Sequence, residues 1–263
     1  EGADQIEPPM PPLICIPTTG GTAADVSQFC VVMDLNEQRK FSIASKAVVP
    51  DVTLVDPETL TTMDPYLSAC TGVDALIHGI EAFVSKGHSE LSDLCALSSL
   101  VHLTENLKAS IDNPDDLERK TKVMLGAMEA GLPFSNASLG ITHAMAHSLG
   151  GMFDWTHGEC VASVFETVID FNFPSKPERY IAIGERIGLA LGGMTEKEKK
   201  ERVVNRLKEL FAGLGLLERL EGAHVNSSDF PHLTERALED VCILTNPRSA
   251  GFRDIEVLYE ASF

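Results

Sequence analysis

The N-terminal part of the chain carries short apolar, partly β-branched runs, each followed by Gly, Pro, Asn or charged residues. Short apolar runs that end at such turn-forming residues predict strands. We therefore expect four strands, at Leu13–Ile16, Phe29–Met33, Phe41–Ile43 and Val52–Val55.

The apolar spacing changes to a helical period after about residue 57. The change predicts two domains, a region of strands and turns over residues 1–60 and an all-helical region over residues 61–263. Asp254 is the expected N-cap of the last helix. The expected helices are Pro65–Lys86, Ser89–Ile111, Leu117–Leu132, Gly140–Phe153, Glu159–Phe173, Glu178–Leu191, Glu196–Ala212, His232–Cys242 and Asp254–Ala261.

Composition narrows the class of protein. Apolar residues make up 44% of the 263 residues, which suits a folded chain with a large core. The net charge of −18 argues against a nucleic-acid partner, because phosphate binding needs a basic face. No window reaches the roughly 18 uninterrupted apolar residues of a membrane span. Six scattered cysteines without a C-x-x-C pair predict reduced thiols and a cytoplasmic location.

Two i, i+4 pairs and one further histidine form the candidate chemistry: Asp74 with His78, His143 with His147, and then His157. On a helix this spacing aims both side chains of a pair at one point. The carboxylate and three of these four imidazoles suit Fe²⁺, Zn²⁺ or another divalent first-row metal, either structural or catalytic. A core histidine and an ordinary ion pair are the simpler alternatives. Small and apolar neighbours favour the metal, because buried polar groups need partners.

A polar turn, Pro17–Asp25, directly follows the first predicted strand. Its threonine hydroxyls and glycine amides suit the phosphate or ribose of a cofactor, although a plain polar turn is an equal alternative. Lys40 is one of few cations in an acidic chain and, taken alone, reads as a solvated surface lysine.

These segments together resemble the iron-dependent (group III) alcohol dehydrogenases, closest to the branch that contains lactaldehyde reductase. The resemblance runs from about Pro12 to the C-terminus and rests on PTTGGTAAD (17–25), RKF (39–41), VTLVD (52–56), TGVDALIHGIEAF (71–83), FSNASLGITHAMAHSLGG (134–151), HGECVA (157–162) and DVC with NPR (240–248). It implies part of an α/β nucleotide-binding domain followed by an all-helical metal domain, an architecture shared with dehydroquinate synthase.

Matched residue by residue, the resemblance implies metal ligands at Asp74, His78, His143 and His157. It places His147 beside the nicotinamide, as a catalytic and cofactor-binding residue. Thr18, Thr19, Thr22 and Lys40 fall on further cofactor-binding positions. The implied activity is hydride transfer between a small primary alcohol or diol and its aldehyde, with NAD or NADP, in a homodimer or larger homo-oligomer.

The sequence departs from the family in lacking the first half of the nucleotide-binding domain, with its glycine-rich loop. Trp155 stands where a smaller residue is expected, and with Phe134, placed in a predicted loop, it could wall the alcohol pocket. Two alternatives stay open: a lyase of the dehydroquinate synthase type, and a metal-binding remnant without activity. The choice between NAD and NADP, the metal, the alcohol and the oligomer also stay open.

Overall fold

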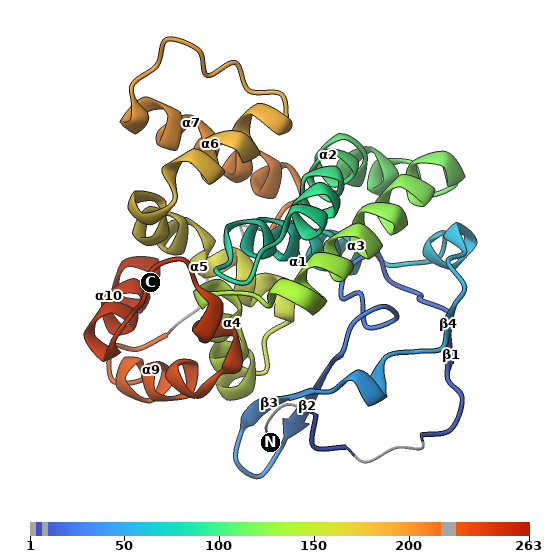
Figure 1. The fold of residues 1–263 in the computed structure, drawn as a ribbon, viewed down its shortest axis with the longest axis horizontal. Helices are drawn as coiled ribbons and strands as arrows, with labels where there is room; N and C mark the ends of the chain where they lie inside the picture. Colours follow the sequence, from blue (N-terminus) through green and yellow to red (C-terminus); the bar gives the residue numbers. More distant parts are fainter. Residues whose placement is uncertain (1–3, 7–9, 217–224) are drawn as a thin grey trace.

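The computed structural model describes residues 4–6, 10–216 and 225–263. A small strand region, at the N-terminal side of the molecule, lies against a larger assembly of helices (Figure 1). The strands are β1 (Ile14–Cys15), β2 (Phe29–Asp34), β3 (Arg39–Ala44) and β4 (Val52–Thr53). All four expected strands form, but β1 and β4 are shorter than expected. Pro17 is one reason, because it has no N–H with which to extend the ladder.

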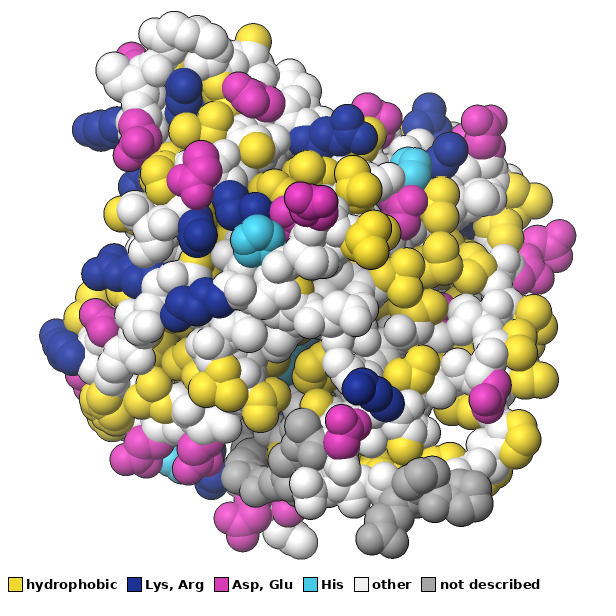
Figure 2. Space-filling view, viewed as in Figure 1, with side chains coloured by type: hydrophobic (Ala, Val, Ile, Leu, Met, Phe, Trp, Pro, Cys, Tyr) yellow, Lys and Arg dark blue, Asp and Glu magenta, His cyan; other side chains and the backbone are white. Residues whose placement is uncertain are grey.

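The strands form two separate pairs. β1 and β4 are parallel, with Ile14 opposite Val52. β2 and β3 form an antiparallel hairpin, with Phe29 opposite Ala44. Apolar side chains of the parallel pair remain exposed: Ile14 is 62% and Val52 45% accessible. Figure 2 shows apolar side chains along the edge of the molecule where β1 and β4 lie.

The helices follow in the expected order and confirm an α/β region followed by an all-helical region. The domain limits at residue 60 stay a prediction. The helices are α1 (Pro65–Val84), α2 (Glu90–Asp112), α3 (Leu117–Ala137), α4 (Ile141–Phe153), α5 (His157–Asn172), α6 (Pro177–Arg186), α7 (Glu196–Gly213), α9 (Phe230–Glu239) and α10 (Phe252–Ser262).

The central helix of the core is α1, which packs against α2, α3 and α5 (Figure 1). Its start is capped by Asp64, whose Oδ1 accepts from the amides of Tyr66 and Leu67 at 2.9 and 3.0 Å. From Ala69 to Val84 the residues of α1 are buried on nearly all sides, as expected of a helix surrounded by protein. By length and composition it could span a membrane, but 83% of its most apolar window is buried inside the protein.

Two local predictions are wrong. The helix α3 continues through Pro133 to Ala137, so Phe134 lies in a helix and not in a loop. Proline removes one backbone donor, and burial of Pro133 and Phe134 in the core outweighs that loss. Asp254 is not the N-cap of α10; it lies inside the first turn, where its Oδ2 accepts from the Gly251 amide at 2.8 Å.

Candidate metal centre and cofactor cleft

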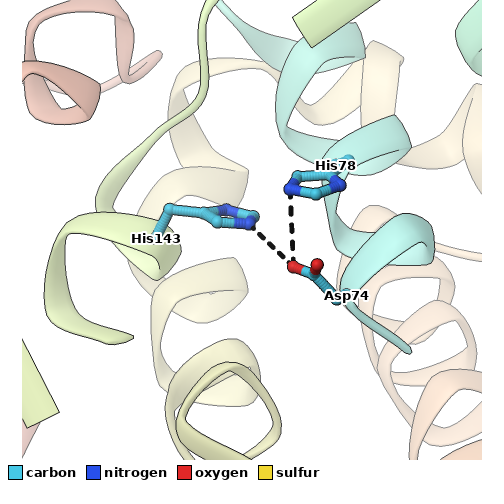
Figure 3. Close-up of side chains that lie close together, drawn as sticks. All are labelled: Asp74, His78 and His143. Carbon is cyan, nitrogen blue, oxygen red and sulfur yellow. Dashed lines mark hydrogen bonds and ion pairs between the residues drawn. The ribbon is translucent and has the colours of Figure 1, made fainter. Parts of the chain in front are cut away.

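The centre begins with two residues one helical turn apart on α1. Asp74 and His78 are both buried, and the Nε2 atom of His78 lies 3.4 Å from Oδ1 of Asp74. The i, i+4 spacing thus places both side chains on one face, as expected. This face of α1 points toward the start of α4 (Figure 3).

Two further imidazoles reach the same carboxylate oxygen from α4 and α5. Nε2 of His143 lies 3.3 Å and Nε2 of His157 lies 3.2 Å from Oδ1 of Asp74. Three imidazole nitrogens from three helices therefore converge on one oxygen atom. The ligand atoms of Asp74, His78 and His143 all lie within 4.8 Å of one another.

The start of α5 is built so that His157 can approach α1. Thr156 precedes the helix, and its amide and hydroxyl donate to Oε2 of Glu159 at 3.0 and 2.6 Å. The hydroxyl of Tyr66 on α1 donates to the other oxygen of Glu159. Gly158 makes the close approach possible, because a Cβ at that position would lie 2.4 Å from the Cys70 carbonyl oxygen.

The electrostatics of the cluster favour neutral rings at His78 and His157 beside an ionised Asp74. Burial lowers the pKa of His78 to about 3 in spite of Asp74, so this ring is neutral. Burial also lowers the pKa of His157. Burial alone would raise the pKa of Asp74, but the charges and hydrogen bonds of the surrounding histidines hold it well below its usual value. Burial alone would lower the pKa of His143, but hydrogen bonds to Asp74 and Glu81 raise it to about 9.

The fifth member of the cluster, Glu81, was not predicted. Its Oε2 lies 2.7 Å from Nδ1 of His143, on the opposite side of the ring from Asp74. Glu81 lies three residues after His78 on α1, within an apolar stretch. That isolated carboxylate on the same helix face was the signal that could have identified it.

His147 lies next to the cluster, one turn after His143 on α4. Its ring stacks on the ring of His157 with centroids 5.2 Å apart. Its Nδ1 lies 2.7 Å from Oδ2 of Asp240, a second carboxylate that was not predicted. Burial would raise the pKa of Asp240, but His147 lowers it far below its usual value. The ligand atoms of His147, Asp240 and Cys242 also lie within 4.8 Å of one another.

The cluster opens on a cleft of about 940 Å³ between the strand region and the helices. Of the predicted cofactor residues, Thr22, Lys40 and His147 line it, while Thr18 and Thr19 are outside the described lining residues. The other site residues that line the cleft are Asp74, His78, Phe134, His143, His157 and Cys242.

Two residues near the cleft have packing roles. A Cβ on Gly21 would lie 2.5 Å from the Thr71 carbonyl oxygen, so the polar turn approaches α1 closely. Trp155 packs against Phe153 and Phe263, with ring centroids 5.4 and 6.1 Å away, and is outside the described residues that line the cleft.

The cluster fits a divalent cation. Oxygen and imidazole nitrogen donors suit first-row divalent metals. The two buried carboxylates, Asp74 and Glu81, together balance two positive charges. Nδ1 of His78 is buried and has no hydrogen-bond partner among the described residues, so protein contacts leave this ring incompletely satisfied. Two imidazoles with lowered pKa values, His78 and His157, a carboxylate that stays ionised and a matching charge suit a metal site, which His143 joins by losing a proton.

A carboxylate and three imidazoles on a helical scaffold, beside a cleft large enough for a cofactor, fit the class of metal-dependent enzymes. Residues 68–263 match the family described as "Fe-containing alcohol dehydrogenase family, C-terminal", and residues 1–57 match "Iron-containing alcohol dehydrogenase". This chain belongs to the iron-containing alcohol dehydrogenase family, and its expected class, an oxidoreductase, is confirmed.

Named relatives agree with this assignment. The chain is 31% identical over 262 residues to 1,3-propanediol dehydrogenase of Klebsiella pneumoniae, covering all of this chain and 68% of the relative. It is 34% identical over 263 residues to lactaldehyde reductase of Escherichia coli strain K12, with the same coverage. A crystal structure of 1,3-propanediol oxidoreductase, 31% identical, superposes with a TM-score of 0.93 over 100% of this chain and 69% of that one.

Proposed function

We propose that this chain transfers hydride between a small primary alcohol or diol and its aldehyde, with NAD or NADP as the partner in the transfer. Asp74, His78, His143 and His157 hold Fe²⁺ or another divalent metal at the base of the cleft. One observation carries the proposal: three imidazole Nε2 atoms lie 3.2 to 3.4 Å from a single oxygen of Asp74.

The relatives support this range of substrates and cofactors. Besides the propanediol dehydrogenase and the lactaldehyde reductase, they include an NAD-dependent methanol dehydrogenase of Bacillus methanolicus, 31% identical. They also include an NADPH-dependent butanol dehydrogenase of Clostridium saccharobutylicum, 35% identical. Both nucleotides therefore occur among relatives, and none of these four names suggests a lyase.

When bound, the metal supplies Lewis-acid polarisation of the substrate oxygen, and the nicotinamide supplies the hydride acceptor or donor. The residues of the chain hold and orient these groups. Asp240 is ionised and accepts the Nδ1 proton of His147, which leaves Nε2 of His147 as an acceptor. His147 takes up the alcohol proton at that nitrogen and passes it to solvent.

The cleft walls place the substrate and the cofactor. Phe134 stacks on His78 with centroids 4.5 Å apart, so it packs directly against a proposed ligand and limits the length of the alcohol. Lys40 and Thr22 line the cleft, and we assign them to cofactor binding. We also assign Thr18 and Thr19, on the same turn as Thr22, to cofactor binding. This assignment rests on the resemblance to the family, because neither residue is among the described cleft-lining residues. Residues 1–60 form the cofactor-side domain and residues 61–263 the metal-side domain.

Metal analysis of His157→Ala tests the proposal. We expect metal affinity to fall by more than about a hundredfold, because losing a direct ligand costs more than losing an outer partner. Turnover is lost with the metal. His232→Ala is the matched control, since His232 is exposed and pairs only weakly with Glu235, at 3.9 Å. Survival of both bound metal and turnover in His157→Ala would refute the ligand assignment.

Calorimetric titration of NADH and of NADPH into this chain tests the cofactor part. Binding of either nucleotide supports the dehydrogenase, and binding of neither favours a metal-binding remnant. We also propose a cytoplasmic location, which agrees with the absence of a disulfide among the six cysteines, all of them described residues. The resemblance to the family supports a homodimer or larger homo-oligomer.

A further inference from the structure

The buried carboxylate of Glu81 has no part in the proposed chemistry, yet it makes three hydrogen bonds to one short segment. Glu81 is 4% exposed. Its Oε2 accepts from the amide of Gly140 at 2.9 Å and lies 2.7 Å from Nδ1 of His143. Its Oε1 accepts from the amide of Thr142 at 2.8 Å. Residues 140–143 are the first turn of α4.

The backbone amides of this first turn need hydrogen-bond acceptors from elsewhere in the fold. The N-cap position of α4 is Gly140, which has no side chain to cap the helix. Glu81 and Asn246 supply the caps instead, since Oδ1 of Asn246 accepts from the Ile141 amide at 3.1 Å. Only Glu81 of the two also bonds to His143, so the two caps can be separated by experiment.

The contact with Glu81 defines that Nδ1 of the His143 ring is protonated. A carboxylate that already accepts from two backbone amides can only accept from the ring as well, so Nδ1 of His143 carries the proton. Nε2 is then the nitrogen directed at Oδ1 of Asp74, 3.3 Å away. Histidine ligands of metals are commonly held in this way by a carboxylate on the other ring nitrogen.

We propose that Glu81 is a positioning residue for the metal centre. It anchors the start of α4 to α1 and presents Nε2 of His143 to the cation through one carboxylate. The inference rests on the proposed metal site. It also explains why a second charged residue lies in a mostly apolar, buried helix: Asp74 and Glu81, seven residues apart on α1, hold His143 from both sides.

The test compares Glu81→Gln with Asn246→Ala in the full chain. The amide of Gln cannot accept all three hydrogen bonds, whereas Asn246→Ala weakens the same helix end without touching His143. Affinity for Co²⁺ is measured by competition with a chelator, and the ligand geometry by the visible absorption of bound Co²⁺. We expect Glu81→Gln to lose about 10- to 100-fold in Co²⁺ affinity and to change the spectrum. Asn246→Ala should lower the unfolding temperature and leave affinity and spectrum unchanged.

Unchanged Co²⁺ affinity and spectrum in Glu81→Gln would overturn the positioning role. So would a loss of affinity that Asn246→Ala reproduces, because it would reflect only a weakened helix end. His157→Ala separates this failure from failure of the metal site itself. If His157→Ala loses Co²⁺ and Glu81→Gln does not, only the role of Glu81 is wrong. If His157→Ala keeps Co²⁺ at wild-type affinity, the metal site and the role of Glu81 are both wrong.

Discussion

Metal binding to this centre should release a proton from His143. In the metal-free protein, burial would lower the pKa of His143, but the hydrogen bonds to Asp74 and Glu81 raise it to about 9. The ring is therefore protonated at neutral pH, and a cation that binds Nε2 has to displace that proton. His78, with a pKa of about 3, is already neutral and releases none.

The pH dependence of metal affinity follows from the release of this one proton. Below about pH 9, each unit of pH changes the protonated-to-neutral ratio of His143 tenfold. We expect the apparent dissociation constant for Zn²⁺ to fall about tenfold per pH unit between about pH 6 and 8 as the pH rises. The free-energy change over that interval is about 2.7 kcal/mol, since one pH unit corresponds to about 1.36 kcal/mol.

Chelator competition at several pH values, corrected for the protonation of the chelator, measures this slope. Calorimetry in buffers with different ionisation enthalpies counts the released protons independently. His232→Ala should give the same slope as the wild-type chain, because His232 lies outside the cluster. A flat profile, with no proton released, would show that His143 is not a protonated ligand, and the electrostatic reasoning would be wrong.

Three further predictions concern single residues. Asp240→Asn should lower kcat by about tenfold or more with bound metal unchanged, because His147 loses the partner that orients it; a wild-type kcat under steady-state assay would contradict this. Gly158→Ala should weaken Zn²⁺ binding and cost about 1–3 kcal/mol of stability in urea unfolding, since the new methyl group meets the α1 backbone; an unaltered protein would show that the approach of α5 is not tight. Phe134→Ala should shift kcat/KM toward longer alcohols, and an unchanged preference would remove Phe134 from the substrate channel.

Helical spacing in the sequence predicted which site residues are neighbours within one helix, but not how the helices meet. Asp74 with His78, and His143 with His147, are neighbours on a helix face, and spacing alone brings each pair together. The convergence of α1, α4 and α5 on one oxygen depends on tertiary packing. Spacing also left open which of the four histidines bind the metal, and the resemblance to a family selected His157 and not His147 as a ligand. Packing also explains why the predicted end of α3 was wrong. Pro133 favours ending the helix locally, but burial of the segment that follows keeps it helical.

The two carboxylates that hold the histidines differ in how visible they are in the sequence. Glu81 lies on the same helix as Asp74 and His78, so a charged residue in an apolar segment could have indicated it. Asp240 lies 93 residues from His147, and the chain around it has no helical or metal-ligand spacing that connects the two. Contacts of this kind are formed only when distant segments meet in the fold.

The two carboxylates buried on α1, Asp74 and Glu81, are unfavourable for folding by themselves, and both belong to the candidate site. A buried carboxylate destabilises a fold by several kcal/mol unless it is paired and hydrogen-bonded. In the metal-free protein the ring of His143, made cationic by a second proton, stands between Asp74 and Glu81, so one positive charge offsets two negative charges. A divalent cation that replaces this proton offsets both. Metal binding therefore lowers the electrostatic cost of the folded core itself, and the metal and the fold stabilise each other through the same two carboxylates.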